Sequence, residues 1–433
     1  MKKTPFVLLA FGLMTTLVAA ENPPVPAADP AALLNEAEEK SPVLRAARAR
    51  LEGSRHVASE VSAPPDPEVS LAYTNDGLSQ FTLGDSEFAV LALNWTQEIR
   101  PFGKRQAAGE VAASASETGE RQLDRLRYQV LSSVKIAYAD LFRIDRTARI
   151  LEEIRATLGS LEETARRRYD VGQGTQESVL KAQTEILLLE AESTRLAQER
   201  KQAESRLNAA VGRPAATKVG PAEVLLTGGL PVDTPLLERV DGSESPEIAV
   251  LEADVRRTQA EAKLARLEKK PDMFWSASYQ YRGDLDPMVM GMFGVRLPLY
   301  ADRKQAQAVA RAESEVVAAG EELANRRILA ESELRERVAR TERADRLIGL
   351  YDQSILPQAA NTLESAQVSY SVGKIGLLDI LGDLKMLLEA RKDRVALDVE
   401  RMQALAELEP LVGLELLNAE GEAAPGGNHA QVP

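Results

Sequence analysis

The sequence contains no cysteine and only two histidines, His56 and His429. Without cysteine the protein can form neither a disulfide framework nor a lipid-modified N-terminal cysteine. Neither histidine has a cluster of candidate ligands around it, and no glycine-rich phosphate loop is present. Because these absences leave no catalytic constellation, we expect a protein that is not an enzyme and that binds no cofactor.

A basic surface and long apolar runs are missing as well. The 53 lysines and arginines are outnumbered by 66 aspartates and glutamates, for a formal net charge of −13. Nucleic-acid-binding proteins normally carry a basic face, so we expect no nucleic-acid partner. After residue 20 no segment approaches the roughly 18 consecutive apolar residues of a transmembrane helix, although membrane β-strands would leave a much weaker signal.

The two ends of the chain differ from the rest. Residues 1–20 combine two lysines, an apolar stretch and small residues at Val18 and Ala20. This pattern is typical of a secretory signal peptide that is removed after Ala20, and the run is short for a retained anchor. Residues 418–433 are poor in large apolar side chains, which predicts a disordered tail.

Between these ends the chain carries one pattern twice. The matching segments are Ser41-Pro42 and Ser245-Pro246, Pro67 and Pro271, KRQA at 104–107 and RKQA at 303–306, and YDVG at 169–172 and YSVG at 370–373. Because these landmarks recur in the same order, they indicate an internal duplication.

The duplication predicts a first repeat over residues 21–212, a connector rich in glycine and proline over 213–243, and a second repeat over 244–417. Each repeat should contain a helix opened by a serine N-cap and a proline, then two strands, then two long helices. The expected helices are 41–62, 103–169 and 175–211, then 245–269, 302–369 and 376–411; the strands lie within 67–97 and 272–297. Pro357 should kink or split the helix over 302–369.

The long helices carry a coiled-coil pattern. Apolar residues between 137 and 165 recur at spacings of three and four, as at Leu141, Ile144, Ala148 and Leu151. A helix over 103–169 would be about 100 Å long at the standard rise per residue. No globular core accommodates that length, so we expect these helices to pack along one another.

The strand candidates hold most of the aromatic residues. Beyond residue 20, 11 of 17 aromatic side chains lie within 67–102 or 271–300. Membrane barrels concentrate tryptophan and tyrosine at the two lipid interfaces. Four strands alone would leave two unpaired edges in lipid, so several copies would have to share one barrel. The alternative is a small soluble sheet that caps a helical rod.

Three methionines, Met288, Met290 and Met292, alternate along the last strand on the face that also carries Arg296. Thioether sulfurs suit soft ions such as Cu(I). Methionine is also a common flexible packing residue, and neighbours on one strand do not make a site by themselves. We therefore expect no metal site here.

The duplicated order of helix, hairpin and helix pair resembles the TolC-like outer membrane efflux proteins over about residues 35–415. The resemblance is carried by TQEIRPFGKRQA (96–107), VRLPLYADRKQA (295–306), RRYDVGQGTQESVL (167–180) and YSVGKIGLLDIL (370–381). It implies a mainly α-helical fold with a membrane β-barrel. Three copies would form one twelve-stranded barrel in the outer membrane of a Gram-negative bacterium, in contact with its lipid. An α-helical barrel would extend from it into the periplasm.

The resemblance also implies partners. In this family the turns between the long helices dock to a periplasmic adaptor protein, which connects the channel to an inner-membrane transporter, here of the resistance-nodulation-division type. The docking residues would be Tyr169, Val171, Gly172, Gly174 and Thr175 in the first turn and Tyr370, Val372, Gly373 and Gly376 in the second.

A periplasmic gate is implied near the second turn. Asp379 matches one acidic ring of the family, whereas the second ring position is Gly382 with Asp383 beside it. Ile375 stands where some relatives have a bracing arginine. The candidate gate is thus Ile375, Asp379 and Asp383, and the alternative is that both aspartates are solvated helix charges.

The segment QEIRPFGKRQA (97–107) resembles the heavy-metal-efflux branch of the family more than the type I protein-secretion branch. A multidrug or type I secretion channel is the alternative. A periplasmic adaptor or structural coiled-coil protein is an alternative of another class. An adaptor would have one helical hairpin between lipoyl-like β-domains, whereas this chain has two hairpins and two strand pairs.

Overall fold

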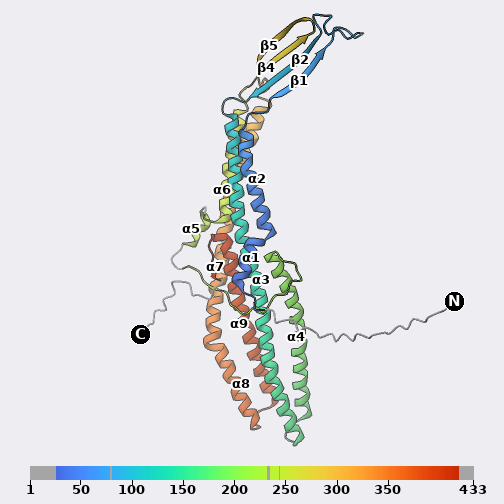
Figure 1. Ribbon diagram of the computed structural model, residues 1–433. Helices are drawn as coiled ribbons and strands as arrows, with labels where there is room; N and C mark the ends of the chain where they lie inside the picture. The colour runs from blue at the N-terminus through green and yellow to red at the C-terminus, as the bar shows by residue number, and fades with distance from the viewer. Residues whose placement is uncertain (1–25, 79, 232–234, 243, 419–433) are drawn as a thin grey trace, which may run out of the picture.

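The computed structural model describes residues 26–78, 80–231, 235–242 and 244–418, and shows a long helical rod that ends in a small sheet (Figure 1). The expected signal peptide, residues 1–20, and residues 419–433 of the expected tail lie outside the described residues. The helices are α1 Pro30–Lys40, α2 Pro42–Ser62, α3 Lys104–Asp170, α4 Gln176–Val211, α5 Leu236–Asp241, α6 Pro246–Leu267, α7 Gln305–Leu350, α8 Leu356–Ser371 and α9 Leu377–Val412. The strands are β1 Glu68–Thr74, β2 Val90–Ile99, β3 Thr227–Gly228, β4 Asp272–Arg282, β5 Leu285–Arg296 and β6 Leu417–Asn418.

The helix α3 forms the axis of the rod and packs against α2, α4, α6 and α9. It runs for 67 residues without a break. Leu141, Ile144 and Leu151 are buried, as the coiled-coil pattern predicts, but Ala148 is exposed. The buried position beside it is Thr147, so the apolar seam is locally displaced by one residue.

Two features of the helix starts differ from expectation. The serines at 41 and 245 precede α2 and α6, but neither side chain makes a capping hydrogen bond. Ser41 also ends α1, where its N–H donates to the Ala37 carbonyl oxygen at 3.1 Å. The helix α1 itself was not expected from the sequence, although Asp29 before Pro30 is a typical start signal and accepts from the Ala31 N–H.

The interruption expected at Pro357 is a π-turn. Residues Tyr351–Ile355 (η1) separate α7 from α8, and Pro357 lies in the first turn of α8. A proline has no N–H to donate and its ring crowds the preceding turn. The wider π-turn removes this conflict while the helix axis continues.

The sheet at the end of the rod has the strand order β1-β2-β4-β5, all antiparallel, so the central β2–β4 pair joins the two repeats. Its register sorts the side chains by face. One row across the four strands is Leu71, Leu93, Tyr279 and Val289, and the adjacent row on the other face is Ser70, Asn94, Ser278 and Met290. The apolar row is exposed, with Val289 at 79 %. An apolar face of this kind is typical of a sheet that lies against lipid or another protein.

Candidate docking and gating site

The turn between α3 and α4 is built around Gly172. Its φ is +73°, and the Gln173 N–H donates to the Arg168 carbonyl oxygen at 2.8 Å while the Gly172 N–H donates to that of Tyr169 at 2.9 Å. This left-handed residue ends the helix and satisfies carbonyl groups of its last turn. Thr175 then starts α4, because its hydroxyl accepts from the Ser178 N–H at 3.3 Å.

The turn between α8 and α9 repeats this geometry. Gly373 has a φ of +76°, and the Lys374 N–H donates to the Ser369 carbonyl oxygen at 2.9 Å. The two turns diverge two residues later. A Cβ on Gly174 would lie 3.1 Å from the Tyr169 nitrogen, whereas the matching Ile375 is half-buried and packs against the core. The two ends of the rod's hairpins are therefore similar but not identical.

Two of the candidate gate residues, Asp379 and Asp383, lie on the first turns of α9, and the third, Ile375, lies in the turn before it. The Asp379 carboxylate accepts from the Gly376 N–H at 3.0 Å and so caps this helix. Asp379 is exposed and Asp383, one turn on, is half-buried. Ile375 is half-buried and packs against the hydrophobic core. Within one protomer the structure thus places both aspartates on one helix, with Asp379 already serving as a cap.

The turn residues expected to dock a partner divide into two groups. Tyr169, Val171 and Val372 are exposed, Val171 at 68 %. Val368 and Leu378 beside the second turn are exposed as well. Tyr370 is 6 % exposed and therefore belongs to the packing beneath the turn, not to its surface. Exposed apolar residues that gather at loop ends are typical of protein–protein contact.

Arg168 connects the two turns, a role that the sequence alone did not reveal. Its Nη1 donates to the Tyr370 carbonyl oxygen at 2.7 Å, and its guanidinium lies 4.8 Å from the centre of the Tyr370 ring. The preceding arginines, Arg166 and Arg167, pair instead with glutamates of their own helix. The run of three arginines at 166–168 was the sequence signal for a contact at this turn. Only the packing of the two hairpins decides that Arg168, and not its neighbours, contacts Tyr370.

Replacing Arg168 with alanine should loosen the contact between the two hairpins of one protomer. The loss of one charge-assisted hydrogen bond and one cation–π contact should speed amide hydrogen exchange around residues 368–373 on the order of tenfold. Mass spectrometry of exchanged peptides measures this. Arg167→Ala, which removes an exposed pair within one helix, should leave exchange unchanged. Equal exchange in the Arg168 and Arg167 variants would contradict the bridging role.

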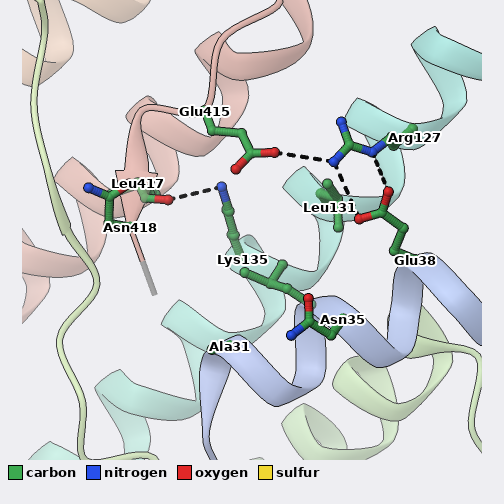
Figure 2. A pocket seen from close by; sticks show the side chains of 10 residues that line it. Ala31, Asn35, Glu38, Arg127, Leu131, Lys135, Glu415, Leu417 and Asn418 are labelled. Atoms are coloured by element: carbon green, nitrogen blue, oxygen red, sulfur yellow. Dashed lines mark hydrogen bonds and ion pairs between the residues drawn. The ribbon is translucent and has the colours of Figure 1, made fainter. Parts of the chain in front are cut away.

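A polar cavity of about 480 Å³ lies midway along the rod, between α1, α3 and the segment after α9 (Figure 2). Beside it Lys135, 2 % exposed, pairs with Glu409, 1 % exposed, at 2.7 Å. Glu409 also accepts from the N–H groups of Leu416 and Leu417. Burial raises the pKa of Glu409, and its contact with the Lys135 ammonium opposes that shift. The cavity's Arg127 pairs with Glu38 and Glu415.

These ion pairs around the cavity therefore join α1, α3, the end of α9 and the segment after it. In the described part of the chain, no group of three or more His, Asp or Glu side chains is placed to hold a metal ion. Met288, Met290 and Met292 lie opposite Gln280, Ser278 and Ser276 on the polar face of the sheet.

None of the described helices is long and apolar enough to cross a membrane.

The sequence matches the outer membrane efflux protein family twice, over residues 33–213 and 242–414. The chain belongs to this family. The two matched segments correspond to the two repeats, each with one hairpin of long helices and one strand pair. No curated protein matches the sequence.

Solved structures share the fold of this outer membrane efflux protein. The outer-membrane channel OprN is 18 % identical, with 89 % of this chain and 90 % of that chain covered and a TM-score of 0.74. VceC from Vibrio cholerae is 21 % identical, with coverages of 89 % and 96 % and a TM-score of 0.74. CusC is 15 % identical, with coverages of 94 % and 98 % and a TM-score of 0.76. At these identities the likeness shows the common fold, which confirms the fold class that the family resemblance implied.

Proposed function

We propose that this outer membrane efflux protein is the passive exit duct of a tripartite efflux system. In it, an inner-membrane transporter of the resistance-nodulation-division type delivers small solutes through a periplasmic adaptor. The observation that carries the proposal is that the two ends of the rod differ. An open sheet with an exposed apolar face lies at one end, and two matched hairpin turns lie at the other (Figure 1).

The sheet supports a trimeric barrel in the outer membrane. Its edges, β1 and β5, have unpaired backbone groups, which are prohibitive in lipid. Pairing β5 of one copy with β1 of the next removes both edges, and three copies give twelve strands. The face with Leu71 and Val289 then contacts lipid, and the face with Ser70 and Met290 lines the pore.

The hairpin turns support adaptor docking at the far end of the periplasmic helices. Val171 and Val372 sit at equivalent places beside Gly172 and Gly373 and are both exposed. Three copies would present six such turns, alternating between the two kinds. Asp379 and Asp383 lie just inside this entrance, where rings of carboxylates would attract cations and constrict the opening.

The cargo follows from the motif resemblance alone. The segment 97–107 favours heavy-metal cations, and a channel for drugs or for type I protein secretion is the second candidate. Cells that lack the protein should become sensitive to the metal salts or to the drugs that the system exports. Growth on graded concentrations of copper, zinc, cobalt and common antibiotics distinguishes these candidates.

The purified protein should form channels in a planar lipid bilayer. Trimers that share a barrel require lipid contact, so detergent should release the protein from membranes and high salt should not. Immunoblotting of salt-washed and detergent-extracted membranes tests this, and single-channel recording measures the conductance. Release by salt alone would exclude the barrel and favour a peripheral coiled-coil protein.

A further inference from the structure

A buried lysine marks the junction between the sheet and the helical rod. Lys104, the first residue of α3, is 2 % exposed. Its Nζ donates to the Lys270 carbonyl oxygen at 2.7 Å and to Asp272 Oδ1 at 2.8 Å. Asp272 begins β4, so the contact joins the start of the long helix in the first repeat to the start of the first strand in the second.

The duplication assigns a counterpart to each member of this pair. Lys104 opens KRQA and Arg303 opens the matching RKQA. Asp272 follows Pro271, and Glu68 follows the matching Pro67. The charge sign is the same at both pairs of equivalent positions, so the sequence encodes a basic helix start and an acidic strand start in each repeat.

Only one of these two junctions is closed within the chain. Glu68 begins β1 and Arg303 follows β5, and β1 and β5 are the opposite edges of the sheet. Both residues are exposed, and among the described residues neither makes an ion pair. By contrast, Lys104 and Asp272 belong to the central β2–β4 side of the sheet, where the two repeats meet.

We propose that Arg303 of one copy pairs with Glu68 of the next and closes the junction between copies as Lys104 and Asp272 close it within a copy. This inference rests on the proposed trimer, in which β5 meets β1 of a neighbour. Lys104 also donates to the Lys270 carbonyl oxygen, and the matching acceptor in the first repeat is the Asp66 carbonyl oxygen. The Arg303 guanidinium would reach this oxygen as well as Glu68, because arginine has five donors and can serve two acceptors at once. A trimer then has six basic–acidic junctions around the base of its barrel, three within copies and three between them.

The pairing can be tested by cross-linking. Because the sequence has no cysteine, an introduced cysteine pair supplies the only thiols that can react with the cross-linker. Glu68→Cys/Arg303→Cys, treated in membranes with a bismaleimide that has a two-carbon spacer, should give covalent dimers and trimers on a denaturing gel. Lys104→Cys/Asp272→Cys should give monomers only. In a third pair, Thr74→Cys/Arg303→Cys, one cysteine moves to the far end of β1, about 20 Å along the strand, and should not cross-link.

Charge reversal tests the energetics of the same contact. Arg303→Glu should reduce the fraction of trimer that survives mild detergent on the order of tenfold, because it places two carboxylates together. Lys304→Glu, the same charge change one residue on, is the matched control and should have little effect. Adding Glu68→Arg to Arg303→Glu should restore the trimer.

The outcomes separate this inference from the proposed function. The pairing is overturned, and the channel is left intact, if the wild type is a stable trimer but Glu68→Cys/Arg303→Cys does not cross-link. Equal losses of trimer in Arg303→Glu and Lys304→Glu would overturn the pairing in the same way. A wild-type protein that is monomeric in lipid overturns the trimeric channel itself.

Discussion

Replacing Lys135 with methionine should lower the free energy of unfolding by about 3–5 kcal/mol, because it leaves the Glu409 carboxylate buried without its counter-charge. The pair is nearly inaccessible to water, at 2 % and 1 % exposure, and joins residues 274 positions apart. Denaturant unfolding of the detergent-solubilised protein, followed by circular dichroism, measures the loss. Unchanged stability would show that the carboxylate is solvated.

Two variants show whether the effect comes from the unpaired charge. Lys135→Met/Glu409→Leu removes both charges and should recover most of the stability, since an apolar pair of similar size does not leave a charge uncompensated. Arg149→Met breaks the exposed pair with Glu223, which is 2.7 Å long, and should cost less than about 1 kcal/mol.

The pH dependence of the Lys135 variant has a defined sign. Burial raises the pKa of Glu409 above its ordinary value, and loss of the ammonium removes an interaction that lowers it. A carboxyl whose folded pKa lies above its unfolded pKa contributes stability at low pH, and this contribution is lost as the pH rises through the folded value. The deficit of Lys135→Met relative to the wild type should therefore be smaller near pH 5 than near pH 8. A deficit that is constant across this range would contradict the shift.

Replacing Gly373 with valine should abolish efflux and leave the trimer intact. A β-branched residue is strained at the φ of +76° found there, and its Cβ would lie 3.0 Å from an Arg168 nitrogen, so the turn must change shape. Gly172→Val, at a φ of +73° and with no atom within 4 Å, tests the turn conformation alone. Resistance of cells and co-purification of the adaptor measure the effect.

Two substitutions serve as controls for the turns. Gly373→Asn retains a residue that tolerates left-handed backbone and should preserve most efflux. Gly159→Val adds the same side chain within α3, where no atom lies within 4 Å of the new Cβ, and should have little effect. Normal resistance in the Gly172 and Gly373 valine variants would count against adaptor docking at these turns.

Local sequence signals anticipated much of the architecture. The glycines at 172 and 373 lie in the turns expected between the long helices, and both have positive φ. The spacing of Leu141, Ile144 and Leu151 predicts a buried seam because helical periodicity places these residues on one face. The short helix α1 was missed, since its Asp-Pro start resembles the proline-rich segment around it.

The candidate site was anticipated less completely. Tyr370 and Tyr169 occupy matching places in the two turns, yet one is 6 % and the other 46 % exposed. Tyr370 belongs to the hydrophobic core, and Arg168 of the first hairpin lies over its ring. Local pattern cannot distinguish two equivalent tyrosines when packing between helices decides which one is buried.

The sequence by itself determined the duplication, the long helices and the places where they reverse, because proline, glycine and apolar spacing act over a few residues. Only the tertiary structure decided which residues meet over long separations: Lys135 with Glu409, Arg168 with Tyr370, and Lys104 with Asp272. Such pairs depend on which helix faces pack together, and many charged residues compete for each partner along the chain. The packing of the helices brings only a few of these charged residues within bonding distance of one another. The local sequence around a residue does not show whether it is one of them.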